Sequence, residues 1–103
     1  MEQGEQTMDE KVIKPGKDIV ASMADGFRKD LLKEVGQGVK KLVIDLQGVQ
    51  MVDSVGIGVL VAAYNSLSRT GGTMAVSNVC EDVYKLFKTM RLDQHFEVVP
   101  AAG

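Results

Sequence analysis

The sequence has few of the side chains that most often build catalytic centres and metal sites. Its 103 residues include one cysteine, one histidine and no tryptophan. A single cysteine excludes an intramolecular disulfide and a multi-cysteine metal site, and a single histidine argues against a zinc site or a histidine-based catalytic centre. We therefore predict that the protein holds no metal and no cofactor, and that it resides in a reducing cytoplasm.

A dominant charge and a long apolar run are also absent. The 12 basic and 14 acidic residues give a formal net charge of −2, so no basic field is present to attract nucleic acid or an anionic membrane. No apolar run approaches the roughly 18 residues of a membrane-spanning helix, and the polar residues 1–10 are unlike a secretory signal. We expect a protein that binds neither nucleic acid nor a membrane.

What is present is an ordinary globular composition, with 45% hydrophobic and 25% charged residues. A chain of this length predicts one domain. We expect a polar, frayed segment at residues 1–8 and a folded domain at residues 9–103. Strand patterns lie at residues 11–14, 40–49, 73–79 and 95–99, and apolar stripes at helical spacing lie within residues 23–35, 54–69 and 83–90.

This alternation of strands and helices predicts an α/β domain with a largely parallel sheet of four to five strands. Asp45, Ser77 and Glu97 place polar side chains on one face of the strands. A parallel sheet that is covered on both faces would be apolar on both. We therefore expect the helices mainly on one face of the sheet.

Two serines fit the starts of helices. Ser22 precedes the first stripe, with Asp25 three residues later as an imperfect capping box. Ser54 precedes the second stripe, and Asp53 beside it suits the positive end of a helix dipole. Two glycines follow Ser54 within the first turns, each at a cost of about 0.5–1 kcal/mol of helix stability. A cap alone does not require them, but the close approach of a backbone or a ligand does.

The helix predicted from Ser54 to Arg69 is apolar on two sides. On a helical wheel, one side should face the sheet and contains Ile57, Leu60, Val61, Tyr64 and Leu67. The opposite side contains Val55, Val59 and Ala62, where an ordinary surface helix would be polar. Either another element covers this side, or it is a docking surface for a partner protein.

Catalytic and nucleotide-binding interpretations of the same segment have less support. The Gly-x-Gly step from Gly56 to Gly58 lacks the third glycine of a dinucleotide fingerprint and the Gly-Lys-Ser/Thr of a phosphate loop. A hydrolase triad would need His95, the only histidine, and Ser54 lacks the G-x-S-x-G elbow. Cys80 fits the start of a helix better than a nucleophile. We therefore predict that the protein is not an enzyme.

The stretch "LVIDLQGVQMVDSVGIGVLVAAYNSL", followed by a glycine pair, a strand and "VYKLFKTMRLDQHFEV", resembles the STAS domain family, and more narrowly the small bacterial anti-sigma factor antagonists. The resemblance runs from about Val12 to Val99. It implies a mixed sheet with helices largely to one side, and a non-enzymatic switch. The serine after the aspartate, here Ser54, would be phosphorylated by an anti-sigma factor with serine kinase activity.

The resemblance also implies how such a switch works. The unphosphorylated antagonist binds the anti-sigma factor and frees the sigma factor, the phosphorylated form releases it, and a phosphatase resets the cycle. The implied protein is a monomer or weak dimer. The expected partner-binding residues occupy the start of this helix: Asp53, Ser54, Val55, Gly56, Gly58, Val59 and Ala62.

This sequence departs from the family pattern at two places. Val55 follows Ser54 where the family often has another serine or threonine. The stretch from Lys17 to Val20 lacks the glycine and the aspartate of the family's Gly-x-Leu-Asp pattern. Two alternatives therefore stay open: a constitutive interaction module in a signalling assembly without phosphorylation, and a nucleotide-binding domain.

Overall fold

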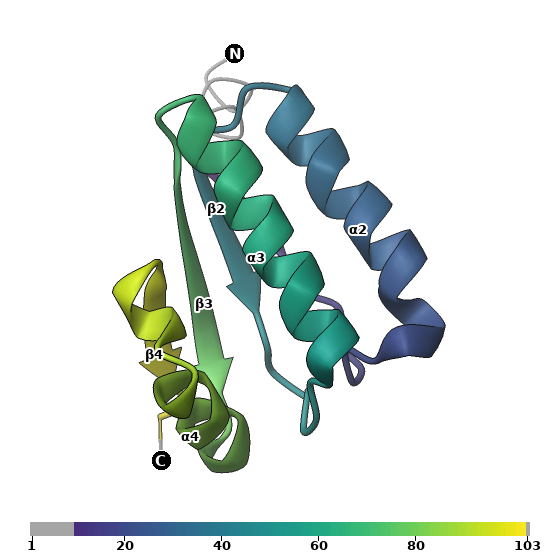
Figure 1. The fold of residues 1–103 in the computed structure, drawn as a ribbon, viewed down its shortest axis with the longest axis vertical. Coiled ribbons are helices and arrows are strands. Elements are labelled where there is room, and N and C mark those ends of the chain that lie inside the picture. Colours follow the sequence, from purple (N-terminus) through teal and green to yellow (C-terminus); the bar gives the residue numbers. More distant parts are fainter. Residues whose placement is uncertain (1–9, 103) are drawn as a thin grey trace.

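The computed structural model describes residues 10–102 and contains a four-stranded sheet with helices packed on it (Figure 1). The strands are β1 (Glu10–Ile13), β2 (Lys41–Asp45), β3 (Thr73–Val79) and β4 (Glu97–Pro100). They lie in the order β1-β2-β3-β4, and every neighbouring pair is parallel. The α/β fold class is therefore confirmed. The segment 1–8 that we expected to be frayed lies outside the described residues.

Parallel neighbours require crossover connections, and helices α2 (Ala21–Gly36) and α3 (Ser54–Arg69) provide two of them. Figure 1 shows these two helices side by side over one face of the sheet. Helix α4 (Glu81–Thr89) lies at the end of β3, and a short 3-10 helix η1 (Leu92–Gln94) leads into β4. We had predicted that the last strand begins at His95. It begins at Glu97 instead, because the single turn of η1 precedes it.

The register separates the two faces of the sheet. Ile13, Ile44, Val76 and Val98 form one row across the four strands, on the face that the helices cover. The adjacent row contains Val12, whose side chain is 52% exposed, and Glu97. The second face is therefore the more open one, as the polar side chains on the strands predicted.

The apolar stripe of α2 packs as its spacing predicts. Phe27 and Leu31 are buried, and Met23 and Val35 lie half-buried against the core. The predicted cap is wrong, because α2 begins at Ala21 with Val20 at the N-cap position and no side-chain hydrogen bond there. Ser22 is the second residue of the helix and not its cap.

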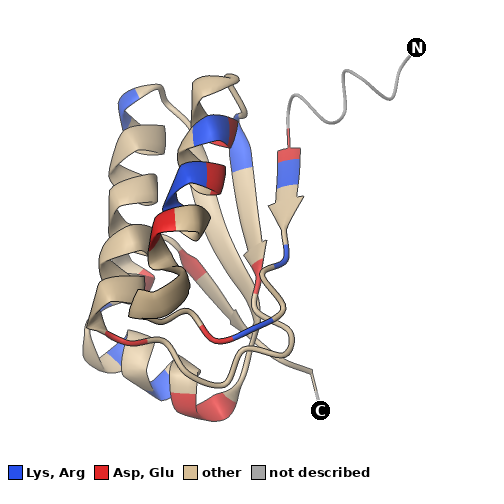
Figure 2. Cartoon of the chain, turned by 90° about the vertical axis from the view of Figure 1, so that its right-hand side faces the viewer, with Lys and Arg blue, Asp and Glu red and all other residues tan. Residues whose placement is uncertain are grey.

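Residues of both charge signs are distributed over the part of the chain that the structure describes. Figure 2 shows acidic and basic residues interspersed along α2, on α4 and in the loops. Among residues 10–102, no helix is both long enough and apolar enough to cross a bilayer.

Candidate functional site

A loop from Leu46 to Val52 connects the end of β2 to the start of helix α3. The N-cap of α3 is Asp53, with φ −89° and ψ −177°, and Ser54 is the first helical residue. The prediction that Ser54 caps the helix is therefore wrong. The side chain of Ser54 is exposed, and since a neighbouring carboxylate provides the cap, the hydroxyl of Ser54 is not needed for it.

The Asp53 carboxylate caps two helices at once. Its Oδ1 accepts a hydrogen bond from the amide of Gly56 in the first turn of α3, at 2.8 Å. Its Oδ2 accepts a hydrogen bond from the amide of Ala21, the first residue of α2, at 3.0 Å. These two amides, with that of Gly56 contributing most, hold the pKa of Asp53 below its usual value. Asp53 is therefore ionised at neutral pH and ties the two helix starts together.

This arrangement accounts for one departure from the family pattern. Val20 stands where the family often has an aspartate, and Val20 is the N-cap position of α2. The amide of Ala21, which follows it, is bound by Asp53 from the other helix instead. The missing local cap is therefore replaced by a tertiary hydrogen bond.

A second aspartate, Asp18, holds the loop in front of Ser54, and the sequence analysis did not identify it. Its Oδ1 accepts hydrogen bonds from the amides of Gln50, at 2.8 Å, and Met51, at 3.1 Å. Beside it, the amide of Ile19 donates to the carbonyl of Met51 and the carbonyl of Ile19 accepts from the amide of Asp53, at 3.0 and 3.1 Å. The only sequence signal was an acidic side chain directly before a buried isoleucine.

The two glycines of the Gly-x-Gly step have different roles. Gly56 is buried, and a Cβ atom there would overlap the carbonyl oxygen of Ile19. Gly56 is therefore required by the close packing of α3 on the segment before α2. Gly58 is exposed, and a Cβ atom there would meet nothing within 4 Å. Nothing within the described fold requires Gly58 to be a glycine.

The predicted docking residues divide into buried and accessible ones. Gly56 and Val59 are buried, so the structure removes both from the accessible surface. Their burial has a physical reason, because α2 and the sheet together cover a wider arc of α3 than the sheet alone would. Ser54, Gly58 and Ala62 remain in line at intervals of four residues, the first two exposed and Ala62 half-buried.

Two apolar residues close to Ser54 in the sequence are exposed. Val55 follows it and is 47% exposed, and Met51, three residues before it, is 56% exposed. Met51 was not among the predicted residues, because its position in a loop gives no periodic signal. We define the α3 start surface as Met51, Asp53, Ser54, Val55, Gly58 and Ala62. It combines a hydroxyl and a carboxylate with small or flexible apolar groups.

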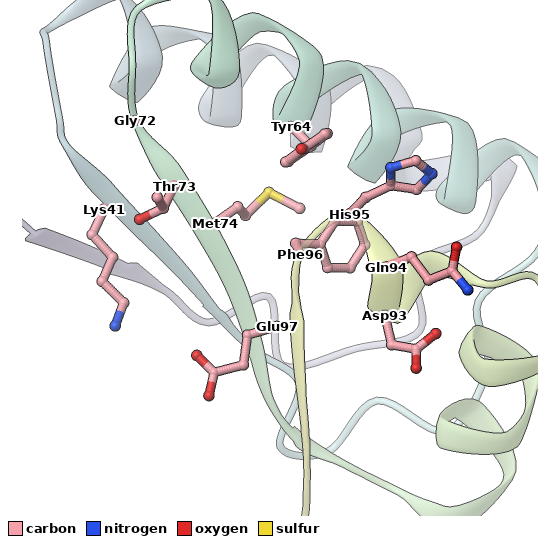
Figure 3. A pocket seen from close by; sticks show the side chains of 10 residues that line it. All are labelled: Lys41, Tyr64, Gly72, Thr73, Met74, Asp93, Gln94, His95, Phe96 and Glu97. Atoms are coloured by element: carbon pink, nitrogen blue, oxygen red, sulfur yellow. The ribbon is translucent and has the colours of Figure 1, made fainter.

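The only histidine does not join this surface. The His95 ring packs beside that of Tyr64, with ring centroids 5.8 Å apart. Tyr64 is ten residues along α3 from Ser54, which is roughly 15 Å at about 1.5 Å per residue. Figure 3 shows His95, Tyr64 and Phe96 together at a hollow of about 510 Å³ between α3 and the start of β4. Ser54 and His95 therefore do not form a catalytic pair.

Cys80 lies at the N-cap of α4, half-buried, as its predicted place at a helix start requires. Within the part of the chain that the structure describes, no three histidine, cysteine or acidic side chains group as metal ligands. The chemistry available near Ser54 is thus that of an exposed hydroxyl beside one ionised carboxylate.

The comparisons with known proteins agree with this fold. A family model described as the STAS domain matches residues 3–102. The crystal structure of a Thermotoga maritima protein, assigned as an anti-sigma factor antagonist, is 27% identical, with a TM-score of 0.83 over 88% of this chain and 79% of its own. The anti-sigma F factor antagonist of Paenibacillus polymyxa is 34% identical over 59 residues, which are 57% of this chain and 48% of its own.

A more distant structure shows the fold alone. The anti-sigma factor antagonist SpoIIAA is 18% identical in both its unphosphorylated and its phosphorylated form. The TM-scores are 0.72 and 0.71, over 94% and 89% of this chain and 84% of each SpoIIAA chain. With the family match covering nearly all of its residues, the chain belongs to the STAS domain family.

Proposed function

We propose that this protein is a phosphorylation-controlled anti-sigma factor antagonist of the cytoplasm, without enzymatic activity of its own. Unphosphorylated Ser54 lies in a surface that binds an anti-sigma factor, which is also the serine kinase. Phosphorylation of Ser54 releases that partner, and a phosphatase restores binding. The consequence is control of transcription that depends on a sigma factor.

The observation that carries the proposal is the position of Ser54. It is exposed at the start of α3, and the exposed apolar residues Met51 and Val55 lie within three positions of it in the sequence. Gly58 and Ala62 continue the surface along α3 without large side chains, so a partner can lie close to the helix backbone. A kinase can reach the hydroxyl because Asp53, rather than Ser54, caps the helix.

A phosphate on Ser54 would act on the partner rather than on the fold. It would add a charge of about −1.5 to −2 beside the ionised Asp53. The amide of Gly56, which a phosphate at a helix start would otherwise seek, is already bound by Asp53. The phosphate is therefore expected to point outward, where docking would require its desolvation against Met51 and Val55. A loss of about 1.4 kcal/mol already weakens binding tenfold.

The comparison with SpoIIAA supports a switch without refolding. The likeness of this chain to the unphosphorylated and to the phosphorylated form is nearly equal, with TM-scores of 0.72 and 0.71. A fold of this kind therefore exists with and without a phosphate, and the same is proposed for this protein.

The first experiment measures the intact mass of the protein purified from its native cells. We expect a species heavier by one phosphate, which phosphatase treatment removes and which is absent from Ser54→Ala. Ser68→Ala, an exposed serine near the end of the same helix, is the matched control and should keep the phosphate. A phosphate that persists in Ser54→Ala would exclude Ser54 as the site.

The second experiment measures the binding of the anti-sigma factor that co-purifies with Ser54→Ala. Ser54→Asp should weaken this binding at least tenfold and leave the circular dichroism spectrum and the melting temperature unchanged. If a partner binds both variants equally and no phosphate is ever found, the protein is instead a constitutive interaction module. Calorimetric titration with nucleotides tests the nucleotide-binding alternative directly.

A further inference from the structure

A groove separate from the α3 start surface lies between β1 and the first half of α2. It has a volume of about 490 Å³. Its apolar lining includes Ile13 at the end of β1, and Met23 and Phe27 on α2. Phe27 is buried, while Ile13 and Met23 keep part of their surface exposed. Figure 2 faces this side of the molecule and shows β1 alongside α2.

Gly26 lines the same groove, and none of the residues 10–102 requires a glycine at this position. It is the sixth residue of α2, beyond the first turn. It does not have the positive φ that favours glycine, and a Cβ atom built on it meets nothing within 4 Å. A glycine inside a helix costs stability relative to alanine. No packing contact in the described fold offsets this loss of helix stability at Gly26. At Gly56 the close contact with Ile19 offsets it.

The charged side chains of the groove lie at its two ends. Lys14 and Lys17, in the segment between β1 and α2, line one end, near the start of α2. Asp30 lines the other end, further along α2. An occupant that matches these charges is acidic at the lysine end, apolar over Gly26 and basic or uncharged near Asp30.

The length of the groove favours a short extended segment. Its lining on α2 runs from Ser22 to Asp30, which is roughly 12 Å at about 1.5 Å per residue. An extended chain of about four residues, at about 3.3 Å per residue, spans this distance. The open groove between a strand and a helix suits such a segment, because the rest of the partner can continue beyond both ends.

We propose that this groove binds a short extended peptide segment of a partner protein, with an acidic residue at the end near Lys14 and Lys17 and an apolar side chain seated over Gly26. Gly26 provides the room for that side chain. The proposal does not depend on the phosphorylation of Ser54, because no residue of the α3 start surface lines this groove.

The test is a selection of random linear peptides, displayed on phage, on the whole chain. We expect enrichment of peptides in which an acidic residue precedes or follows an apolar residue. Gly26→Leu, whose side chain would fill the groove, should weaken the selected peptides at least tenfold. Ser68→Leu adds the same side chain to an exposed position of another helix and should leave their affinity unchanged.

Charge reversal provides the second arm. Lys14→Glu combined with Lys17→Glu should weaken the peptides at least tenfold, while Lys29→Glu combined with Lys33→Glu, which changes the net charge equally on exposed positions of α2, should not. Peptides that are insensitive to Gly26→Leu, or that contain no acidic residue, would overturn the proposal. Failure to enrich any peptide would overturn it too, and so would saturable binding of anilinonaphthalene sulfonate at Gly26 without any peptide, which would identify a small-molecule groove.

Discussion

The Oδ2 atom of Asp53 accepts a hydrogen bond from the amide of Ala21, which lies thirty-two positions earlier in the chain, at 3.0 Å. The other oxygen of the same carboxylate binds the first turn of α3 at Gly56. A residue next to the proposed phosphorylation site therefore also fixes the relative position of two helix starts. The positive ends of both helix dipoles converge on this one negative charge.

The first prediction concerns the two oxygens of Asp53. Asp53→Asn keeps an oxygen for the amide of Gly56 but presents an NH₂ group that cannot accept from Ala21. Asp53→Ala removes both hydrogen bonds. We expect the melting temperature to fall in the order wild type, Asp53→Asn, Asp53→Ala, as measured by circular dichroism. Equal melting temperatures for the asparagine and alanine variants would show that the bond to Gly56 contributes nothing.

The second prediction concerns stability at acid pH. The pKa of Asp53 is lowered in the folded state, chiefly by the amide of Gly56, and that of Asp45 is lowered chiefly by the side chain of Asn78. At pH values below 3.8, the usual pKa of an aspartate, these two carboxylates bind more protons in the unfolded chain than in the folded one. The stabilisation is thus complete above about pH 4 and is lost as the pH falls through the lower, folded pKa.

Urea unfolding at a series of pH values between 7 and 2 measures this effect. The free energy of unfolding of the wild type should fall steeply below about pH 4. Asp53→Asn cannot titrate at this position, so its curve should be shallower in that range although it starts lower at pH 7. If both curves fell in parallel, Asp53 would have the same pKa in the folded and unfolded chain.

The third prediction isolates the bond between β2 and β3. Asn78 Nδ2 donates to Asp45 Oδ1 at 2.9 Å, and Asn78 has a φ of +55°. Asn78→Gly accepts this backbone conformation without strain and removes only the side chain. The pKa of Asp45, followed by carbon-detected NMR, should rise toward its usual value of 3.8. The pKa of Asp53 in the same spectra is the internal control and should not move.

The fold could be predicted from the sequence largely because its patterns are local. The bounds of α3 and β3 follow from the apolar stripe, the glycine pair after Arg69 and the strand pattern at residues 73–79, and the structure has both elements there. The site could be predicted only in part. Ser54 and Asp53 are both residue types that cap helices, and the sequence does not show that Asp53 also accepts a hydrogen bond from the distant amide of Ala21.

Tertiary contacts also decide the roles of Gly56, Gly58 and Val59. Gly56 and Gly58 look alike in the sequence, and they differ only because Ile19, far along the chain, packs against one of them. The helical wheel placed Val59 on the side of α3 opposite the sheet and left open whether another element covers it; Val59 belongs to the core because α2 also packs on α3. Contacts between distant segments carry information that the spacing of residues within one helix does not contain.

The fourth prediction uses this pair of glycines as matched variants on one helix. Gly56→Ala must displace the Ile19 backbone, and overpacking of this kind costs about 1–3 kcal/mol of the free energy of unfolding. Gly58→Ala meets no atom within 4 Å and should raise that free energy by about 0.5–1 kcal/mol through helix propensity. Urea denaturation measures both. Destabilisation by Gly58→Ala would reveal a packing role for that glycine.

The last prediction separates docking from folding. Met51 is 56% exposed, so Met51→Lys should change the free energy of unfolding by no more than about 0.5 kcal/mol. If Met51 docks against the anti-sigma factor, the same variant should weaken binding at least tenfold, because a charged amine would have to be desolvated at an apolar contact.

Val99 provides the matched control for Met51. It is 39% exposed on β4, away from the α3 start surface, and Val99→Lys adds the same charge there. Binding measured by calorimetry should be weakened by Met51→Lys and unchanged by Val99→Lys. Equal losses in both variants would mean that net charge, and not contact at Met51, governs binding; no loss in either would remove Met51 from the docking surface while leaving Ser54 to be tested by its own variants.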